Sequence, residues 1–267
     1  MANPLNSFFW NLALQGDENG RLIVIRHLHR CKDKVELPCY AGTGEGEDRL
    51  QTITPVGELI GHAVGVALRG NDLKVVSRIS SNQRRGLRTD AIIVQGLLGA
   101  IVPSPYVKYV AYTCLPDERL GDISHDPRFS AEIKSAFKVV KGNLKCSSER
   151  AVVATPACHA LLWDKLQEAF PCLSEMCTQI MGGGDALAMG LHGCVIDGLH
   201  NMFDAQLKSE TVNGIHHLLP TYYDRFAPER VDGQILKGEG FCVFTKRGVP
   251  VRLMPLKLPD ELIALAA

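Results

Sequence analysis

The chain of 267 residues is 46% hydrophobic and carries 29 basic and 29 acidic side chains, so its formal net charge is zero. A chain of this length can bury a substantial core, and a zero net charge gives no electrostatic reason to expect nucleic acid or an anionic membrane as a partner. No run reaches 18 consecutive apolar residues, which predicts no transmembrane helix. The first twenty residues lack the basic and apolar regions of a signal peptide.

The nine cysteines are irregularly spaced and include no Cys-x-x-Cys pair. An odd number at such spacing indicates neither a disulfide framework nor a zinc site. We therefore expect a cytoplasmic protein whose cysteines are mostly small buried apolar residues.

The pattern of apolar residues and turn residues predicts alternating strands and helices. Residues 21–27 read as a strand that is apolar on both faces, and 28–52 as a long glycine-containing loop. A helix follows, capped by Thr54 and ended by Gly70. The later predicted elements are a strand at 73–79, a helix from about 82, a strand at 106–114, a mostly helical stretch at 126–182 interrupted near Gly142 and at Pro171, a strand at 185–191, a helix at 193–207, and a hairpin around Arg247-Gly248.

This alternation is typical of an α/β fold, and we predict a three-layer α/β/α arrangement with a mostly parallel central sheet. We expect a single domain over residues 1–267, with a helical insertion around 115–182 that covers the active site. Ligands of such sheets bind beyond the carboxyl ends of the strands. Polar clusters follow three of the predicted strands, at Arg26-His27, at Ser81–Arg85 and at His192-Gly193.

Four polar segments occur in a fixed order along the chain. They are Arg26-His27-Leu28 after a strand, Thr54-Pro55-Val56-Gly57 at the start of a helix, Ser81, Arg85 and Thr89 at intervals of four, and His192-Gly193 before a helix. In this order they resemble the motifs of the histidine phosphatase superfamily, which includes cofactor-dependent phosphoglycerate mutases and histidine acid phosphatases. The resemblance covers roughly residues 21–255.

The resemblance implies a phosphate site at the end of the first strand. His27 would be the nucleophile and would form a phosphohistidine intermediate. Arg26 and Arg85 would bind the phosphate oxygens in the bidentate manner that suits guanidinium groups, with His192 as a further donor. Arg30 falls where the acid-phosphatase branch has an additional phosphate-binding arginine.

The leaving oxygen needs a proton, and a carboxylic acid in the pocket is its usual source. The mutase-like branch has a glutamate in a segment after the third strand, and the segment LPDERLGD lies at the matching place. We expect Glu118 to be the acid, with Asp117 as the alternative if the register differs by one residue.

The chain departs from the family pattern at Leu28, which stands where the motif has glycine, and a leucine at positive φ would be strained. His29-Arg30 replaces the Glu-Ser usual in mutases, which favours a phosphatase that needs no metal or other cofactor and acts on a phosphorylated small molecule or a phosphoprotein. Three alternatives remain open at this point. One is a mutase-type phosphotransferase, one is a phosphate-binding protein without activity, and one is a metallohydrolase that uses the pair His27-x-His29.

Overall fold

The computed structural model describes residues 8–29, 53–99, 114–144, 151–152, 154–219 and 235–264. Within these ranges the chain forms a six-stranded sheet and seven α-helices. The strands are β1 (Gly20–Arg26), β2 (Val75–Ser81), β3 (Leu115–Asp117), β4 (Gly184–Leu191), β5 (Gly240–Lys246) and β6 (Val249–Leu256). The helices are α1 (Pro55–Arg69), α2 (Arg84–Leu98), α4 (Ala131–Leu144), α6 (Pro156–Gln179), α7 (Gly193–Leu207), α8 (Ile215–Leu218) and α9 (Asp260–Ala264), with short 3₁₀ turns η4 (Glu118–Leu120) and η5 (Ile123–His125).

The strands follow the order β3-β2-β4-β1-β5-β6. The first four strands in this order run parallel, β5 pairs antiparallel with β1, and β6 pairs antiparallel with β5. Strands β1 and β4 lie in the middle and are buried along nearly their whole length. This explains why both sequences are apolar at consecutive positions, since helices cover both faces of such strands.

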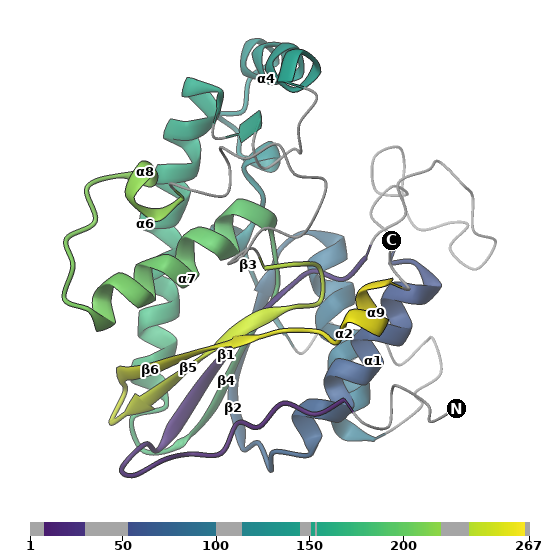
Figure 1. Ribbon diagram of the computed structural model, residues 1–267, viewed down its shortest axis with the longest axis vertical. Coiled ribbons are helices and arrows are strands. Elements are labelled where there is room, and N and C mark those ends of the chain that lie inside the picture. Colours follow the sequence, from purple (N-terminus) through teal and green to yellow (C-terminus); the bar gives the residue numbers. More distant parts are fainter. Residues whose placement is uncertain are drawn as a thin grey trace.

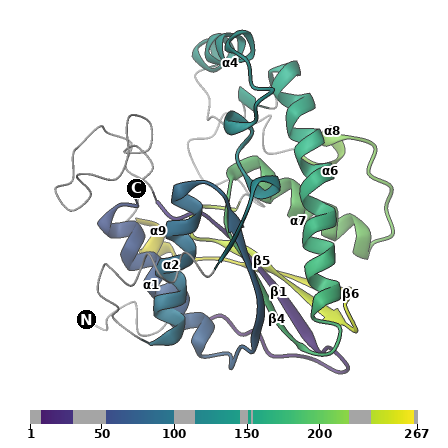
Figure 2. The ribbon, with the colours of Figure 1, turned by 180° about the vertical axis from the view of Figure 1, so that it is seen from behind.

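Helices α1, α2 and α9 cover one face of the sheet, and α6 and α7 cover the other (Figures 1 and 2). Each face has its own apolar core. Along β1, Leu22 and Val24 belong to the core under α6 and α7, whereas Ile23 and Ile25 belong to the core under α1 and α2. The predicted three-layer α/β/α fold with a mostly parallel sheet is therefore confirmed.

Several local predictions are confirmed as well. The Thr54 side chain caps α1 by accepting a hydrogen bond from the Gly57 amide at 3.0 Å, and α7 occupies residues 193–207 as expected. Strands β5 and β6 form the closing hairpin, and Arg247 and Gly248 both have positive φ at its two-residue turn. Two consecutive positive φ values match the twist of the flanking strands.

The predicted interruption at Pro171 is wrong, because α6 continues through this residue. Proline removes the hydrogen bond to the carbonyl four residues earlier, which belongs to Gln167. Both Gln167 and Pro171 are exposed, so solvent can bind that carbonyl. Ala169, Cys172 and Leu173 are buried on the opposite side of the helix, and this packing holds the helix together across the proline.

The helical insertion between β3 and β4 contains α4 and α6, and α4 projects from one end of the molecule (Figure 1). Most of the loop predicted at 28–52, and most of the strand predicted at 106–114, lie outside the described residues. Strand β3 begins just after the latter. In the part of the chain that is described, no helix has both the length and the apolar character needed to cross a membrane.

Candidate active site

The sheet order brings the three polar clusters together. Strand β4 lies between β1 and β2, and the three strands run parallel, so the residues after their carboxyl ends meet at one edge of the sheet. The rings of His27 and His192 lie 5.1 Å apart between centroids. Arg85 contacts His192 from the first turn of α2.

His27 is buried, and its hydrogen bond fixes which ring nitrogen carries the proton. Nδ1 lies 2.8 Å from the carbonyl oxygen of Leu28, and because a carbonyl only accepts, Nδ1 must be the donor. The Nε2 lone pair is then available to an incoming electrophile. Burial lowers the pKa of His27 well below its ordinary value, and electrostatic interaction with the neighbouring His192, Arg26 and Arg85 lowers it further. The imidazole is therefore neutral at neutral pH.

His192 connects α2 to the end of β2. Its Nδ1 accepts hydrogen bonds from Nη2 and Nε of Arg85 at 2.9 and 3.2 Å. Its Nε2 lies 3.1 Å from the Ser81 hydroxyl, and Nε2 must carry the proton if Nδ1 accepts. His192 is thus held as the neutral tautomer, and it can donate to a phosphate through Nδ1 only after gaining a proton and releasing Arg85.

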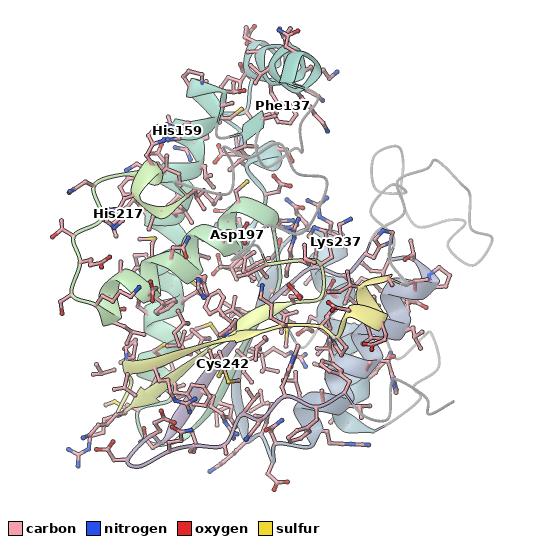
Figure 3. The ribbon with its side chains drawn as sticks, viewed as in Figure 1. Phe137, His159, Asp197, His217, Lys237 and Cys242 are labelled. Carbon is pink, nitrogen blue, oxygen red and sulfur yellow. The ribbon has the colours of Figure 1, made fainter. Side chains whose placement is uncertain are left out.

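Arg26 is held by the segment that precedes β5. Its Nη1 donates to the carbonyl oxygen of Ile235 at 2.6 Å, while the Ile235 amide donates to Asp197 at 3.0 Å. Asp197 lies on α7 (Figure 3) and is almost completely buried. The Asp197 carboxylate thereby fixes the Ile235 peptide group, and the carbonyl of Ile235 in turn fixes Arg26. Nothing in the local sequence around Asp197 indicates this role.

Leu28 fits the site without backbone strain. It is not among the described residues with positive φ, and its side chain is completely buried in the core beside α1. The space comes from Gly61 of α1, where an added Cβ would lie 2.4 Å from Leu28 Cδ1. The Leu28 amide donates to the Thr89 hydroxyl at 3.0 Å, and that hydroxyl donates to the Arg85 carbonyl at 2.8 Å. The backbone at Leu28 therefore links the end of β1 to α2, while the leucine side chain packs away into the core beside α1.

Gly190 permits the close approach of α2 to β4. It has φ +73° at a bulge where the register between β1 and β4 shifts. A Cβ there would lie 2.3 Å from Gly86 Cα. Because Gly86 directly follows Arg85, this glycine contact sets how near the guanidinium lies to His192.

The structure brings a different carboxylate into the site from the two that the sequence suggested. Glu118 is exposed on η4. Asp117 Oδ2 lies 2.7 Å from Arg119 Nη2. Burial alone would raise the pKa of Asp117, but the hydrogen bonds from Arg119 outweigh burial, so the pKa is lowered. A carboxyl group with a lowered pKa is a poor proton donor at neutral pH.

Among the described residues, Asp122 is the one that places a carboxylate beside Arg85 and His192. Its Oδ2 accepts a hydrogen bond from Arg85 Nη2 at 2.8 Å and lies 3.9 Å from His192 Nδ1. Its Oδ1 accepts from the Ser124 amide at 3.1 Å, which fixes the carboxyl group as the cap of η5. Asp122 is the last residue of the segment LPDERLGD, the same segment in which the sequence analysis places the acid at Glu118 or Asp117.

Arg30, the remaining predicted phosphate ligand, lies outside the described residues. His29 is within them, and its Nδ1 lies 3.1 Å from the Thr54 hydroxyl. Comparison of the sequence with protein-family models and with curated proteins gives no match. The α/β fold and the cluster of two histidines, two arginines and an aspartate at the carboxyl edge of the sheet are therefore the basis for any functional conclusion.

Proposed function

We propose that the protein is a metal-independent phosphomonoester hydrolase that works through a phosphohistidine intermediate on His27. The observation that carries the proposal is a buried, neutral imidazole whose Nδ1 is bound to a backbone carbonyl, with Arg26 and Arg85 on the same edge of the sheet. Guanidinium groups stabilise the charge on the equatorial oxygens of a phosphoryl group during transfer.

In the first step, His27 Nε2 would attack phosphorus. The bond from Nε2 to phosphorus forms as the bond from phosphorus to the ester oxygen breaks, and that oxygen leaves as an alcohol after gaining a proton. In the second step, water attacks the phosphohistidine, which releases inorganic phosphate and restores neutral His27. Arg26, Arg85 and protonated His192 would hold the phosphoryl oxygens in both steps.

Asp122 is our proposed proton donor to the leaving oxygen, and its carboxylate would accept a proton from water in the second step. Two observations favour it over Glu118 and Asp117: its contact with Arg85, and its distance of 3.9 Å from His192. A phosphate dianion beside the carboxyl group favours its protonated form, because two negative charges repel at short range. The substrate would thus promote the protonation that the first step requires.

The substrate class in this proposal is a phosphorylated small molecule or a phosphoprotein, and the location is the cytoplasm. The six cysteines within the described residues are buried thiols, which suits a reducing compartment. Phosphate binding without turnover, and transfer of the phosphoryl group to a second substrate, are outcomes that the experiment below distinguishes.

The test is hydrolysis of phenyl phosphate by the wild type and by His27→Ala, both with EDTA present, followed by acid-free quenching and phosphoenzyme analysis. We expect EDTA-resistant turnover that is lost in the variant, together with an acid-labile, base-stable adduct on the wild type. Equal turnover by His27→Ala would refute the phosphohistidine mechanism, and turnover abolished by EDTA would favour a metallohydrolase. Saturable binding of inorganic phosphate without turnover of any tested ester would indicate a binding protein.

A further inference from the structure

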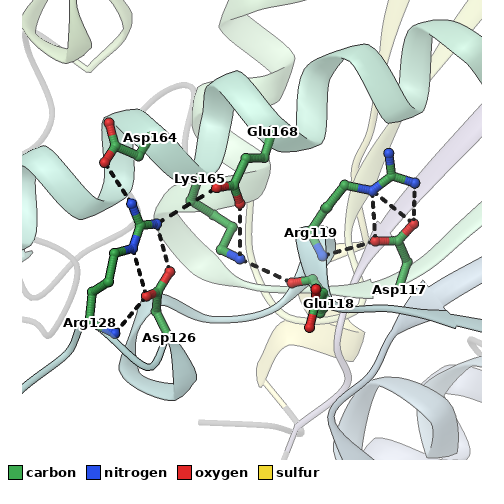
Figure 4. Close-up of polar contacts among 8 residues, drawn as sticks. All are labelled: Asp117, Glu118, Arg119, Asp126, Arg128, Asp164, Lys165 and Glu168. Atoms are coloured by element: carbon green, nitrogen blue, oxygen red, sulfur yellow. Dashed lines mark hydrogen bonds and ion pairs between the residues drawn. The ribbon is translucent and has the colours of Figure 1, made fainter.

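The segment that carries Asp122 is attached to α6 at two places, one before and one after that residue, and Figure 4 shows the contacts at Glu118 and at Arg128 that make these attachments. Before Asp122, Lys165 Nζ donates to the carbonyl oxygen of Glu118 at 3.1 Å. After Asp122, Arg128 binds Asp126 and Asp164, each at 2.8 Å. Asp122 itself is held on a short stretch between these two attachments.

Lys165 is unusual among the lysines of the described ranges because its side chain is only 8% exposed. Burying an ammonium group is costly unless its hydrogen bonds are satisfied. Here it donates to Glu118 O, and a carboxylate oxygen of Glu168 lies 3.6 Å away. The same Glu118 carbonyl accepts the Gly121 amide at 3.0 Å and so closes η4. Lys165 therefore stabilises the turn that ends immediately before Asp122.

The residues of α6 that hold this segment share one side of the helix. Lys165, Glu168 and Cys172 follow at intervals of three and four, which places them on the same face. Cys172 Sγ donates to Asp117 Oδ2 at 3.4 Å. Contacts from a single helix thus fix the start of the segment. The position of Asp122 Oδ2 is fixed separately, by its hydrogen bond from Arg85 Nη2.

We infer that Lys165 is a positioning residue that keeps Asp122 where it can protonate the leaving oxygen. The inference depends on the proposed function, in which Asp122 supplies that proton. Lys165 touches neither the phosphate ligands nor His27 in the described structure, so it acts only through the turn. Its loss would displace the acid and leave the phosphate site intact.

This role makes a prediction that a purely structural role does not make. A leaving group that departs as a stable anion needs little protonation, whereas a poor leaving group depends on the acid. We therefore compare kcat/KM, which reports the phosphorylation step, for phenyl phosphate and 2,4-dinitrophenyl phosphate. The variants are Lys165→Met, Lys165→Arg and the control Lys74→Met, which alters an exposed lysine before β2, at the opposite end of the sheet.

For Lys165→Met we expect kcat/KM on phenyl phosphate to fall about 100-fold, as for a misplacement of about 1 Å in a catalytic group. On 2,4-dinitrophenyl phosphate we expect a change of no more than roughly threefold, since little proton donation is needed. Lys165→Arg, which keeps a charged donor, should recover part of the loss, and Lys74→Met should match the wild type. An equal loss on both substrates, or no loss on either, would overturn the inference.

If Lys165→Met does not fold, as judged by circular dichroism and thermal unfolding, Arg128→Gln carries the test. Arg128 is 46% exposed and holds the segment after Asp122, so its replacement should cause the same selective loss to a smaller extent. An unselective effect of Arg128→Gln would then overturn the inference. Failure of the proposed function looks different, because His27→Ala would then retain the wild-type activity or the wild type would show none on either ester.

Discussion

Asp122 and a bound phosphate would compete for Arg85, and this competition can be measured by replacing Asp122 with asparagine. In the structure, Arg85 Nη2 lies 2.8 Å from Asp122 Oδ2, and the two side chains are 4% and 31% exposed. A phosphate oxygen that takes this N–H must displace the carboxylate. Asp122→Asn keeps an oxygen that can accept the Ser124 amide and removes the negative charge.

The size of the effect follows from the strength of this contact. A hydrogen bond to a charged group contributes about 1.5–3 kcal/mol, and partial exposure of the carboxylate reduces this to about 1–1.4 kcal/mol. Since 1.4 kcal/mol is about a factor of ten in affinity, we expect inorganic phosphate to inhibit the variant with a Ki roughly five- to tenfold lower than for the wild type. On phenyl phosphate, kcat should fall by about 10²-fold or more, because the general acid is lost.

The assay is competitive inhibition by inorganic phosphate at pH 7, with 2,4-dinitrophenyl phosphate as the reporter because it needs the acid least. A lower Ki combined with a lower kcat on phenyl phosphate supports both roles of Asp122. An unchanged or higher Ki in folded protein would refute the competition for Arg85. Glu118→Gln is measured in parallel: if Glu118 were the acid, the loss of kcat would follow that substitution instead.

Three further predictions concern stability. As the pH falls from 7 to 5, the wild type should lose up to about 1.4 kcal/mol of unfolding free energy per pH unit relative to His27→Gln. The reason is that the pKa of His27 is lowered in the folded state, so the unfolded state binds the proton first. Urea unfolding measured across this range would contradict the prediction if the unfolding free energies of the two proteins changed equally with pH. Arg21→Ala should cost about 3–5 kcal/mol, since it leaves the buried Asp185 carboxylate without its ion-pair partner, and a loss below 1 kcal/mol would argue against this. Gly190→Ala should cost about 3 kcal/mol or more through positive φ and the clash with Gly86, visible as a lower Tm together with weaker phosphate binding.

Much of the fold could be predicted because the relevant signals are local. The consecutive apolar residues of β1 and β4 mark strands that are covered on both faces, and their observed bounds differ from the predicted ones by about one residue. The start of α1 follows from Thr54 and Pro55, which form a cap and a first turn. The turn at Arg247-Gly248 is equally local. What the sequence did not give was the order of the strands, which alone decides whether His27, Arg85 and His192 meet.

Asp122, the proposed acid, could not be singled out from the sequence because its contact with Arg85 joins residues distant in sequence. Asp117, Glu118 and Asp122 all lie within six residues, and each is a reasonable candidate by type. Which carboxylate lies beside Arg85 depends on η4 and η5, two 3₁₀ turns without an apolar period, and on the approach of Arg85 from α2. Pro171 was misjudged for a related reason: the packing of α6 against the sheet outweighs the local preference of proline.

In the described structure the two arginines at the site are already bound to protein acceptors, Arg26 to Ile235 O and Arg85 to His192 and Asp122. On the proposed function, phosphate would have to exchange with these acceptors, which would weaken binding of the ground state and of the product alike. Only interactions that are stronger in the transition state than in the ground state accelerate a reaction. A hydrolase whose product is phosphate gains from such an arrangement, since the guanidinium groups stay oriented while the product can leave. A protein that only binds phosphate would gain nothing from it, and the Ki of Asp122→Asn therefore also bears on the choice between these two functions.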